Sequence, residues 1–189
     1  MDWDERFLRG DGLHGYVPSP PLRQAVQGIA PGHALDLACG AGRHAIFLAE
    51  HGWKVHAVDA SQVGVQRMLD EAYKRGVSKL ILAEVADIES PRFRVEGEHD
   101  LVSVFYFLHR PLFAQIRRAV RPGGIFVAAI HVRSARDEEG RFLLEPGELR
   151  ALFSDWEIVL SREGAAAESN HRHGTLGVMY LVSGVRLLF

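Results

Sequence analysis

This chain has few of the sequence features that mark disulfide-rich, membrane-spanning or secreted proteins. Among its 189 residues Cys39 is the single cysteine, which excludes an intramolecular disulfide framework and fits a reducing compartment. No apolar run reaches the ~18 residues that a membrane span needs. The charged N-terminus, MDWDERFLRGDG, has no apolar stretch of the signal-peptide kind. These absences predict a cytoplasmic protein with no membrane partner.

Net charge and composition further limit the classes of protein to which the chain could belong. The formal net charge is −2, so the chain lacks the basic footprint of a protein whose main ligand is nucleic acid. Hydrophobic residues make up 47% and charged residues 24% of the chain, as in ordinary globular proteins. We predict one domain over residues 1–189, in which residues 32–189 form the core. Residues 1–31 are rich in glycine, proline and large aromatics, and we interpret them as a flap over a site.

The stretch ALDLACGAGRHAIFLAEHGWKVHAVD, residues 34–59, organises the chain. It predicts a strand over 34–38, a turn at Gly40 and Gly42 where the backbone can approach a ligand, a helix over 44–50 and a strand over 53–58. Asp59 stands at the end of that second strand. Such strand–turn–helix–strand units belong to parallel sheets with right-handed crossovers.

The rest of the chain continues this alternation of strands and helices. Patterning predicts further helices from Ser61 to about Gly76, after Pro111 and over 145–152, and a turn at residues 121–124. Further strands are predicted over 79–85, 100–107, 125–130, 156–160 and 176–185. The last two are joined only by a loop, so we expect them to pair antiparallel at the edge. The fold class is therefore α/β, a doubly wound, seven-stranded, mostly parallel sheet.

Ligands of doubly wound sheets lie at the carboxyl ends of the strands, where this chain carries acids. Asp36 precedes the glycine turn, Asp59 follows the second strand 17 positions after Gly42, and Asp87 follows the third strand. The spacing to Asp59 suits a carboxylate that binds ribose hydroxyls. A dinucleotide fits the G-x-G-x-x-A pattern formally, but Asp36 would repel its pyrophosphate. An ammonium and a sulfonium suit that acid, which favours S-adenosylmethionine.

The same residues carry a resemblance to a known family. DLACGAGRHAIFLAEHGWKVHAVDAS, VAD at 85–87 and RPGGIFV resemble motifs of class I S-adenosylmethionine-dependent methyltransferases. WDERF, CGAGRH and GELRALFSDWEIV resemble the small tellurite-resistance and thiopurine-type members, although Ala38 replaces a glycine and His44 an asparagine. The resemblance implies S-adenosylmethionine as cofactor, S-adenosylhomocysteine as product, a Rossmann-like fold and cofactor contacts at Asp36, Ala38, Gly40, Gly42, Asp59, Ala60, Asp87, Ile88 and Phe105.

The acceptor of the methyl group is less well marked. A small molecule is expected, because no separate recognition domain or basic face is evident, and a soft sulfur, selenium or tellurium nucleophile would need no strong base. Candidate acceptor-binding residues are His109, His131, Arg133, His171, Arg172 and His173. We assign catalysis to His131, and to His171 and Arg172 because the resemblance places a His-Arg pair there. No metal site is predicted, and the protein is expected to be a monomer or homodimer.

Two other functions stay open at this point. An NAD(P)-dependent oxidoreductase would use the G-x-G-x-x-A pattern, but no hydride-transfer constellation accompanies it. A non-catalytic cofactor-binding protein would keep the fold without an acceptor site. Turnover and binding measurements would separate these alternatives from a methyltransferase.

Overall fold

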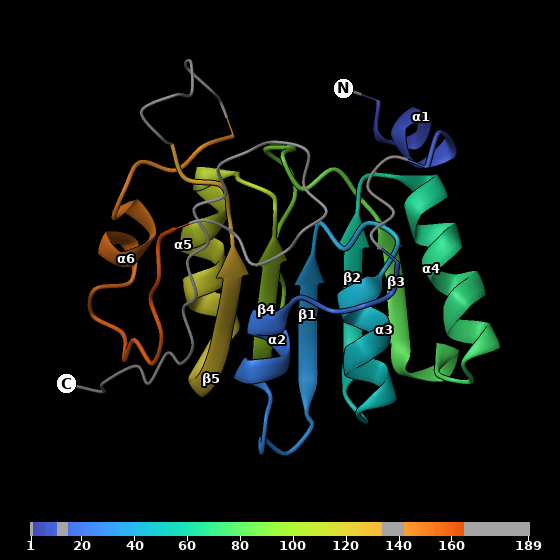
Figure 1. The fold of residues 1–189 in the computed structure, drawn as a ribbon, viewed down its shortest axis with the longest axis horizontal. Coiled ribbons are helices and arrows are strands. Elements are labelled where there is room, and N and C mark those ends of the chain that lie inside the picture. Colours follow the sequence, from blue (N-terminus) through green and yellow to red (C-terminus); the bar gives the residue numbers. More distant parts are fainter. Residues whose placement is uncertain (1, 11–14, 134–141, 165–189) are drawn as a thin grey trace.

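The computed structural model describes residues 2–10, 15–133 and 142–164. Its centre is one five-stranded parallel sheet of order β3-β2-β1-β4-β5 (Figure 1). The strands are β1 (His33–Leu37), β2 (Lys54–Asp59), β3 (Ile81–Val85), β4 (His99–Phe105) and β5 (Val120–Ala129). The strand order reverses between β1 and β4, and this is the place where doubly wound sheets bind their ligands.

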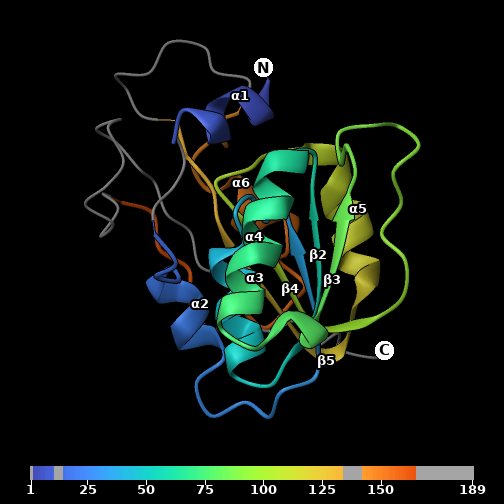
Figure 2. The same ribbon diagram turned by 90° about the vertical axis from the view of Figure 1, so that its right-hand side faces the viewer.

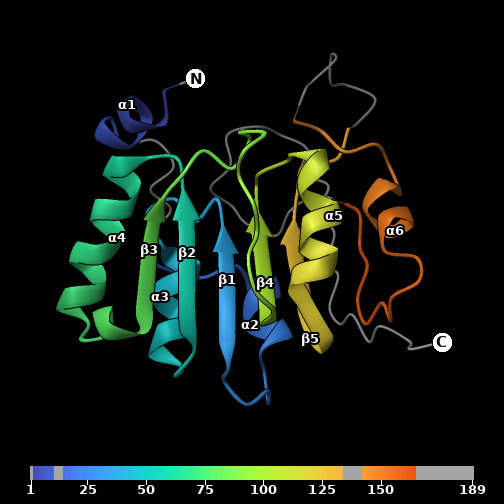
Figure 3. The ribbon, with the colours of Figure 1, turned by 180° about the vertical axis from the view of Figure 1, so that it is seen from behind.

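Helices cover both faces of the sheet. The α-helices are α1 (Trp3–Leu8), α2 (Pro20–Ala25), α3 (Arg43–Glu50), α4 (Gln62–Lys74), α5 (Arg110–Ala119) and α6 (Glu148–Leu152), with a short 3₁₀ turn, η1 (Ser78–Leu80). Viewed along its edge, the sheet separates α2, α3 and α4 from α5 (Figure 2). The view from behind shows α5 and α6 together on the other face (Figure 3).

The central strands are buried because their sequences are apolar on both faces. All residues of β1 after His33 are buried, as are the last five of β4, which is typical of parallel strands with helices on both sides. Each face has its own core. One cluster joins α2, α3 and α4 to the sheet, and the other joins α5 and α6 to it. The predicted parallel α/β architecture is thus confirmed.

Local signals in the sequence coincide with the observed ends of several elements. The hydroxyl of Ser61 accepts the Gly64 N–H at 2.9 Å, so Ser61 caps α4 as predicted. Pro111 lies in the first turn of α5. Residues 121–124, predicted as a turn, belong instead to β5, where the register of the β4–β5 pairing shifts: Val120 pairs with His99, and Ile125 already pairs with Leu101.

One predicted strand is absent from the structure, and another lies beyond the described residues. Residues 156–160 form no strand, so that prediction is wrong. Trp156 is instead buried against Phe153, with ring centroids 5.0 Å apart, and Arg117 lies over both rings. This packing holds the segment beside α5 and α6. Residues 176–185, the other member of the expected antiparallel pair, lie outside the described residues, so seven strands are not confirmed.

The N-terminal segment contains a helix that the sequence analysis did not predict. Asp2 caps α1 by accepting the Glu5 N–H at 3.2 Å, and α1 lies against α4 at the end of the sheet where the strands stop (Figure 1). Phe7 is its buried residue. In the described part of the chain, no helix has the length and apolar character to cross a bilayer.

Candidate active site

The turn after β1 consists of small residues and lies at the edge of the sheet where the strands end, called the rim below. Ala38, Gly40 and Gly42 all have left-handed φ angles, of 56°, 55° and 82°. A side chain at Gly42 would overlap Met68 of α4, so glycine is required there for space as well as for conformation. Ala38 adopts the left-handed region despite its Cβ. The turn ends at the N-terminus of α3, where peptide N–H groups lack helical partners.

Asp59, the last residue of β2, holds this turn against β2 through hydrogen bonds. Its carboxylate accepts the Gly40 N–H at 2.8 Å through Oδ2 and the Ser61 N–H at 2.8 Å through Oδ1. The side chain is 8% exposed. Burial raises the pKa of Asp59, while these backbone hydrogen bonds act in the opposite direction. Each carboxylate oxygen has a further lone pair, so Asp59 can still accept ribose hydroxyls at the rim.

Asp36 is a buried carboxylate with an unfilled acceptor. Its Oδ1 accepts the Ser103 hydroxyl at 2.6 Å, whereas its buried Oδ2 has no hydrogen-bond partner among the described residues. Burial raises the pKa of Asp36 to about 7, while the charge of Arg43 and the Ala45 N–H also act on the carboxyl and lower its pKa. A buried carboxylate of this kind is costly unless a donor or a cation joins it. The site therefore fits a cofactor that carries positive charge, which is what S-adenosylmethionine offers.

The residues that the resemblance assigns to the adenine follow along the same rim. The Ala86 N–H donates to the Asp59 carbonyl at 2.9 Å, which continues the β2–β3 ladder and brings Asp87 to the neighbouring strand end. Asp87 is exposed and accepts the Glu89 N–H at 2.9 Å, whereas Ile88 is buried. Ala60 is exposed beside Asp59. The structure thus brings together the predicted cofactor residues from the ends of β1, β2 and β3.

Phe105, predicted to lie near the reacting methyl group, belongs to the core. It is 6% exposed and packs against the ring of His44 with centroids 4.0 Å apart. Tyr106 is the partly exposed residue at this strand end, and it has a left-handed φ of 59°. The ring of His131 lies 5.6 Å from that of Tyr106, centroid to centroid, so His131 is at the same rim.

The other two acceptor candidates among the described residues each lie beside a glutamate. Arg133 pairs with Glu145 at 2.8 Å, and His109 lies 3.9 Å from Glu89. His171, Arg172 and His173 lie outside the described residues. Arg43 and Tyr106 also lie near this rim but were not among the predicted site residues. Arg43 opens α3 directly after the glycine turn, whereas no sequence signal marks the left-handed backbone of Tyr106.

The N-terminal helix α1 also contacts this rim. The Asp4 carboxylate accepts the Ser61 hydroxyl at 2.5 Å and the Val63 N–H at 3.0 Å, so Asp4 joins Ser61 at the N-terminus of α4. A Cβ at Gly40 or Gly64 would come within 3.1 or 3.0 Å of the Phe7 ring, closer than an ordinary van der Waals contact. The predicted flap therefore contacts the glycine turn directly.

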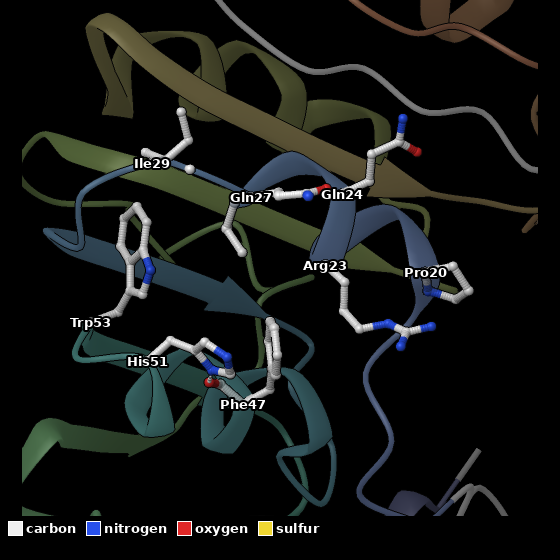
Figure 4. A pocket seen from close by; sticks show the side chains of 10 residues that line it. Pro20, Arg23, Gln24, Gln27, Ile29, Phe47, His51 and Trp53 are labelled. Carbon is white, nitrogen blue, oxygen red and sulfur yellow. Dashed lines mark hydrogen bonds between the residues drawn. The ribbon is translucent and has the colours of Figure 1, made fainter.

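A separate cavity lies away from the strand ends. It has a volume of about 580 Å³ and lies between α2 with its following loop and α3 (Figure 4). Phe47 of α3 lines it together with His51 and Trp53 from the connection between α3 and β2, opposite Arg23 and Gln24 of α2. None of the predicted site residues lines it. We therefore place the candidate active site at the strand ends.

Comparisons with known proteins agree with this geometry. The family described as "Tellurite resistance protein TehB" matches residues 18–175. Hemagglutinin 1 of Eikenella corrodens is 31% identical over 150 residues, which are 75% of this chain and 49% of that protein. The 2-heptyl-1-hydroxyquinolin-4(1H)-one methyltransferase of Mycobacteroides abscessus is 28% identical over 177 residues, 84% of this chain and 78% of that one. The chain thus spans about half of the first relative's length.

Solved structures show the same fold. The crystal structure of TehB from Haemophilus influenzae superposes with a TM-score of 0.77 at 16% identity, covering 96% of this chain and 66% of that one. S-adenosylmethionine-dependent methyltransferases from other organisms share the fold as well. The family match and the shared fold confirm the predicted resemblance to the small tellurite-resistance members.

Proposed function

Since the chain belongs to the TehB family of class I S-adenosylmethionine-dependent methyltransferases, we propose that it methylates a small molecule at a soft sulfur, selenium or tellurium atom. The observation that carries the cofactor part of this proposal is the pair of acids at adjacent strand ends. Asp36 has an unfilled buried oxygen, and Asp59 is held at the rim by Gly40 and Ser61. Together they suit a ligand with both positive charge and a ribose.

Each group of residues would hold a different part of the cofactor. Asp36 and the backbone of Ala38, Gly40 and Gly42 would bind the methionine part, with Asp36 offsetting its positive charge. Asp59 would accept the ribose hydroxyls. Ala60, Asp87 and Ile88 would bind the adenine. When bound, S-adenosylmethionine supplies a methyl group that is activated by its attachment to a sulfonium.

The acceptor side needs alignment more than it needs acid–base chemistry. A lone pair of the acceptor forms the new bond to the methyl carbon while the carbon–sulfur bond breaks and its electron pair stays on sulfur. Alignment of the two reactants can contribute on the order of 7–11 kcal/mol. A soft anion requires no deprotonation at that step. His131, and also His171 and Arg172, are the proposed acceptor-side residues.

A small acceptor is supported by the composition and by one relative. The chain has a net charge of −2 and no basic face is evident in its sequence, which disfavours nucleic acid as acceptor. The relative from Mycobacteroides abscessus carries the name of a quinolone methyltransferase, which is a small-molecule activity. A cytoplasmic location and a monomeric or homodimeric state remain predictions.

Titration calorimetry and a transfer assay test the proposal in sequence. We expect S-adenosylmethionine and S-adenosylhomocysteine to bind and NADH and NADPH not to bind, because Asp36 would repel a pyrophosphate. Methyl transfer from labelled S-adenosylmethionine should then be measurable with tellurite, selenite or benzenethiol, and weaker with an amine. Failure of both adenosyl compounds to bind would refute the cofactor assignment. Binding without transfer to any acceptor would instead indicate a non-catalytic cofactor-binding protein.

A further inference from the structure

The cavity between α2 and α3 is lined by a buried tryptophan whose hydrogen-bond donor faces inward. Trp53 is 2% exposed, and no described residue accepts its indole N–H. Among the described side chains, Asp36 Oδ2 is the one fully enclosed polar atom without a partner, so the Trp53 nitrogen is open to the cavity. Figure 4 shows this nitrogen on the edge of the ring that faces the cavity. Buried indole N–H groups usually have an acceptor, and a ligand in the cavity would supply one.

An aromatic wall lies beside Trp53 in the cavity (Figure 4). The rings of Phe47 and His51 have centroids 4.2 Å apart. His51 Nδ1 lies 2.8 Å from the Phe47 carbonyl oxygen, and because a carbonyl only accepts, Nδ1 carries a proton and donates the hydrogen bond. This bond fixes the His51 ring beside that of Phe47. The two rings offer a surface on which a flat aromatic ligand can pack.

The opposite wall of the cavity carries a cation. Arg23, in α2, is exposed, and its guanidinium has no ion-pair partner in the part of the chain that the structure describes. It lies at the other end of the cavity from Trp53 (Figure 4). No acid is found among the described residues that line the cavity, whereas Gln24 and Gln27 add amide groups. A guanidinium pairs well with a carboxylate, through two parallel hydrogen bonds, so this end of the cavity favours an anion.

A buried contact separates the cavity from the strand ends. The Ser19 N–H donates to His44 Nε2 at 3.3 Å, and the Ser19 hydroxyl lies 3.1 Å from the same nitrogen. Both residues are buried. Because Ser19 directly precedes α2 and His44 is in the first turn of α3, this contact joins the two helices between the cavity and the glycine turn. A ligand in the cavity and a cofactor at the rim can therefore be bound at the same time.

We propose that this cavity is a second ligand site, for an elongated aromatic carboxylate. The carboxylate pairs with Arg23, the ring packs on Phe47, and an acceptor atom at the far end receives the Trp53 indole N–H. The cavity volume of about 580 Å³ lies within the roughly 300–1,000 Å³ of typical small-molecule sites. A ligand with a single polar end satisfies only one of the two polar groups, because they lie at opposite ends. The site does not depend on the proposed methyltransferase function, since it shares no residue with the cofactor site.

Calorimetric titration with 6-hydroxy-2-naphthoate, which has a carboxylate and a hydroxyl at opposite ends, tests the proposal. Wild-type protein should bind one molecule per chain, with the same affinity in the absence and presence of S-adenosylhomocysteine. Arg23→Gln should bind the naphthoate about fivefold more weakly, as expected for the loss of an exposed ion pair. The same substitution should not change the affinity for 2-naphthol, which has no carboxylate. Arg118→Gln, at an exposed arginine on α5, is the matched control and should bind as wild type does.

Trp53 supplies an independent variant at the other end of the cavity. Trp53→Phe removes the indole N–H, so it should weaken binding of 6-hydroxy-2-naphthoate severalfold more than binding of 2-naphthoate, which lacks the hydroxyl. Trp3→Phe, at a 38% exposed tryptophan of α1, is its control. If Trp53→Phe does not fold, Arg23→Gln decides alone, because its side chain lies outside the core.

Three results would overturn the proposal: no saturable binding of 6-hydroxy-2-naphthoate to wild type, equal affinity in wild type and Arg23→Gln, or displacement of the naphthoate by S-adenosylhomocysteine. The last result would place the naphthoate at the strand ends. Failure of S-adenosylhomocysteine itself to bind would count against the proposed function and would leave the comparison of wild type with Arg23→Gln valid.

Discussion

Replacement of Asp36 by asparagine should change the pH dependence of folding. Asp36 is 1% exposed and its pKa in the folded protein is about 7, raised by burial from an ordinary value of 3.8. A carboxyl group whose pKa is higher in the folded state destabilises that state wherever only the unfolded chain ionises. The penalty is therefore absent below about pH 4, grows as pH rises and is complete above about pH 7.

The size of the effect follows from the pKa change. A rise from 3.8 to about 7 corresponds to a penalty of about 4 kcal/mol above neutral pH. That is a large part of the 5–15 kcal/mol that typically stabilises a folded domain, so ~4 kcal/mol is readily measurable. Asparagine keeps an acceptor for the Ser103 hydroxyl and cannot ionise. Asp36→Asn should therefore gain stability over wild type as pH rises.

Urea unfolding followed by tryptophan fluorescence is a suitable assay, since Trp53 and Trp156 are buried. The difference in unfolding free energy between Asp36→Asn and wild type should move in favour of the variant by up to about 4 kcal/mol between about pH 4 and about pH 8. Asp70→Asn, at an exposed aspartate on α4, should show no comparable trend. Parallel pH profiles for wild type and Asp36→Asn would refute the reasoning.

Three further predictions concern the glycine turn and the N-terminal helix. Asp59→Ala should weaken S-adenosylhomocysteine binding at least about tenfold in calorimetry, through loss of the ribose acceptor; unchanged affinity would remove Asp59 from that role. Ala38→Gly should raise the unfolding free energy by up to about 1 kcal/mol in urea titrations, because glycine adopts φ 56° without strain although it adds entropy to the unfolded chain; a clear loss of stability would contradict this. Asp4→Ala should speed tryptic cleavage after Arg6 and Arg9, since Asp4 joins α1 to Ser61 and Val63. S-adenosylhomocysteine should slow that cleavage in wild type if the flap closes over the site, and equal rates with and without it would argue against closure.

Much of the fold was accessible from the sequence because its signals are local. Apolar runs mark the buried parallel strands, Ser61 and Pro111 mark helix starts, and Gly40 with Gly42 marks the turn. Parallel strands place their carboxyl ends on one edge, so the acids that follow them could be assigned to one rim. The strand predicted over 156–160 failed because a β-pattern does not reveal that Trp156 packs on Phe153 instead.

The sequence by itself determined the parallel sheet, the glycine turn and the acids of the rim, since these follow from periodicity and chain order. Only the tertiary structure decided how each acid is used. It buries Asp36 against Ser103 with one oxygen unfilled, and it ties Asp59 to the turn. It likewise buries Phe105 and presents Tyr106 to Arg43. Burial, backbone strain and contacts between distant segments arise from packing, which no local pattern encodes.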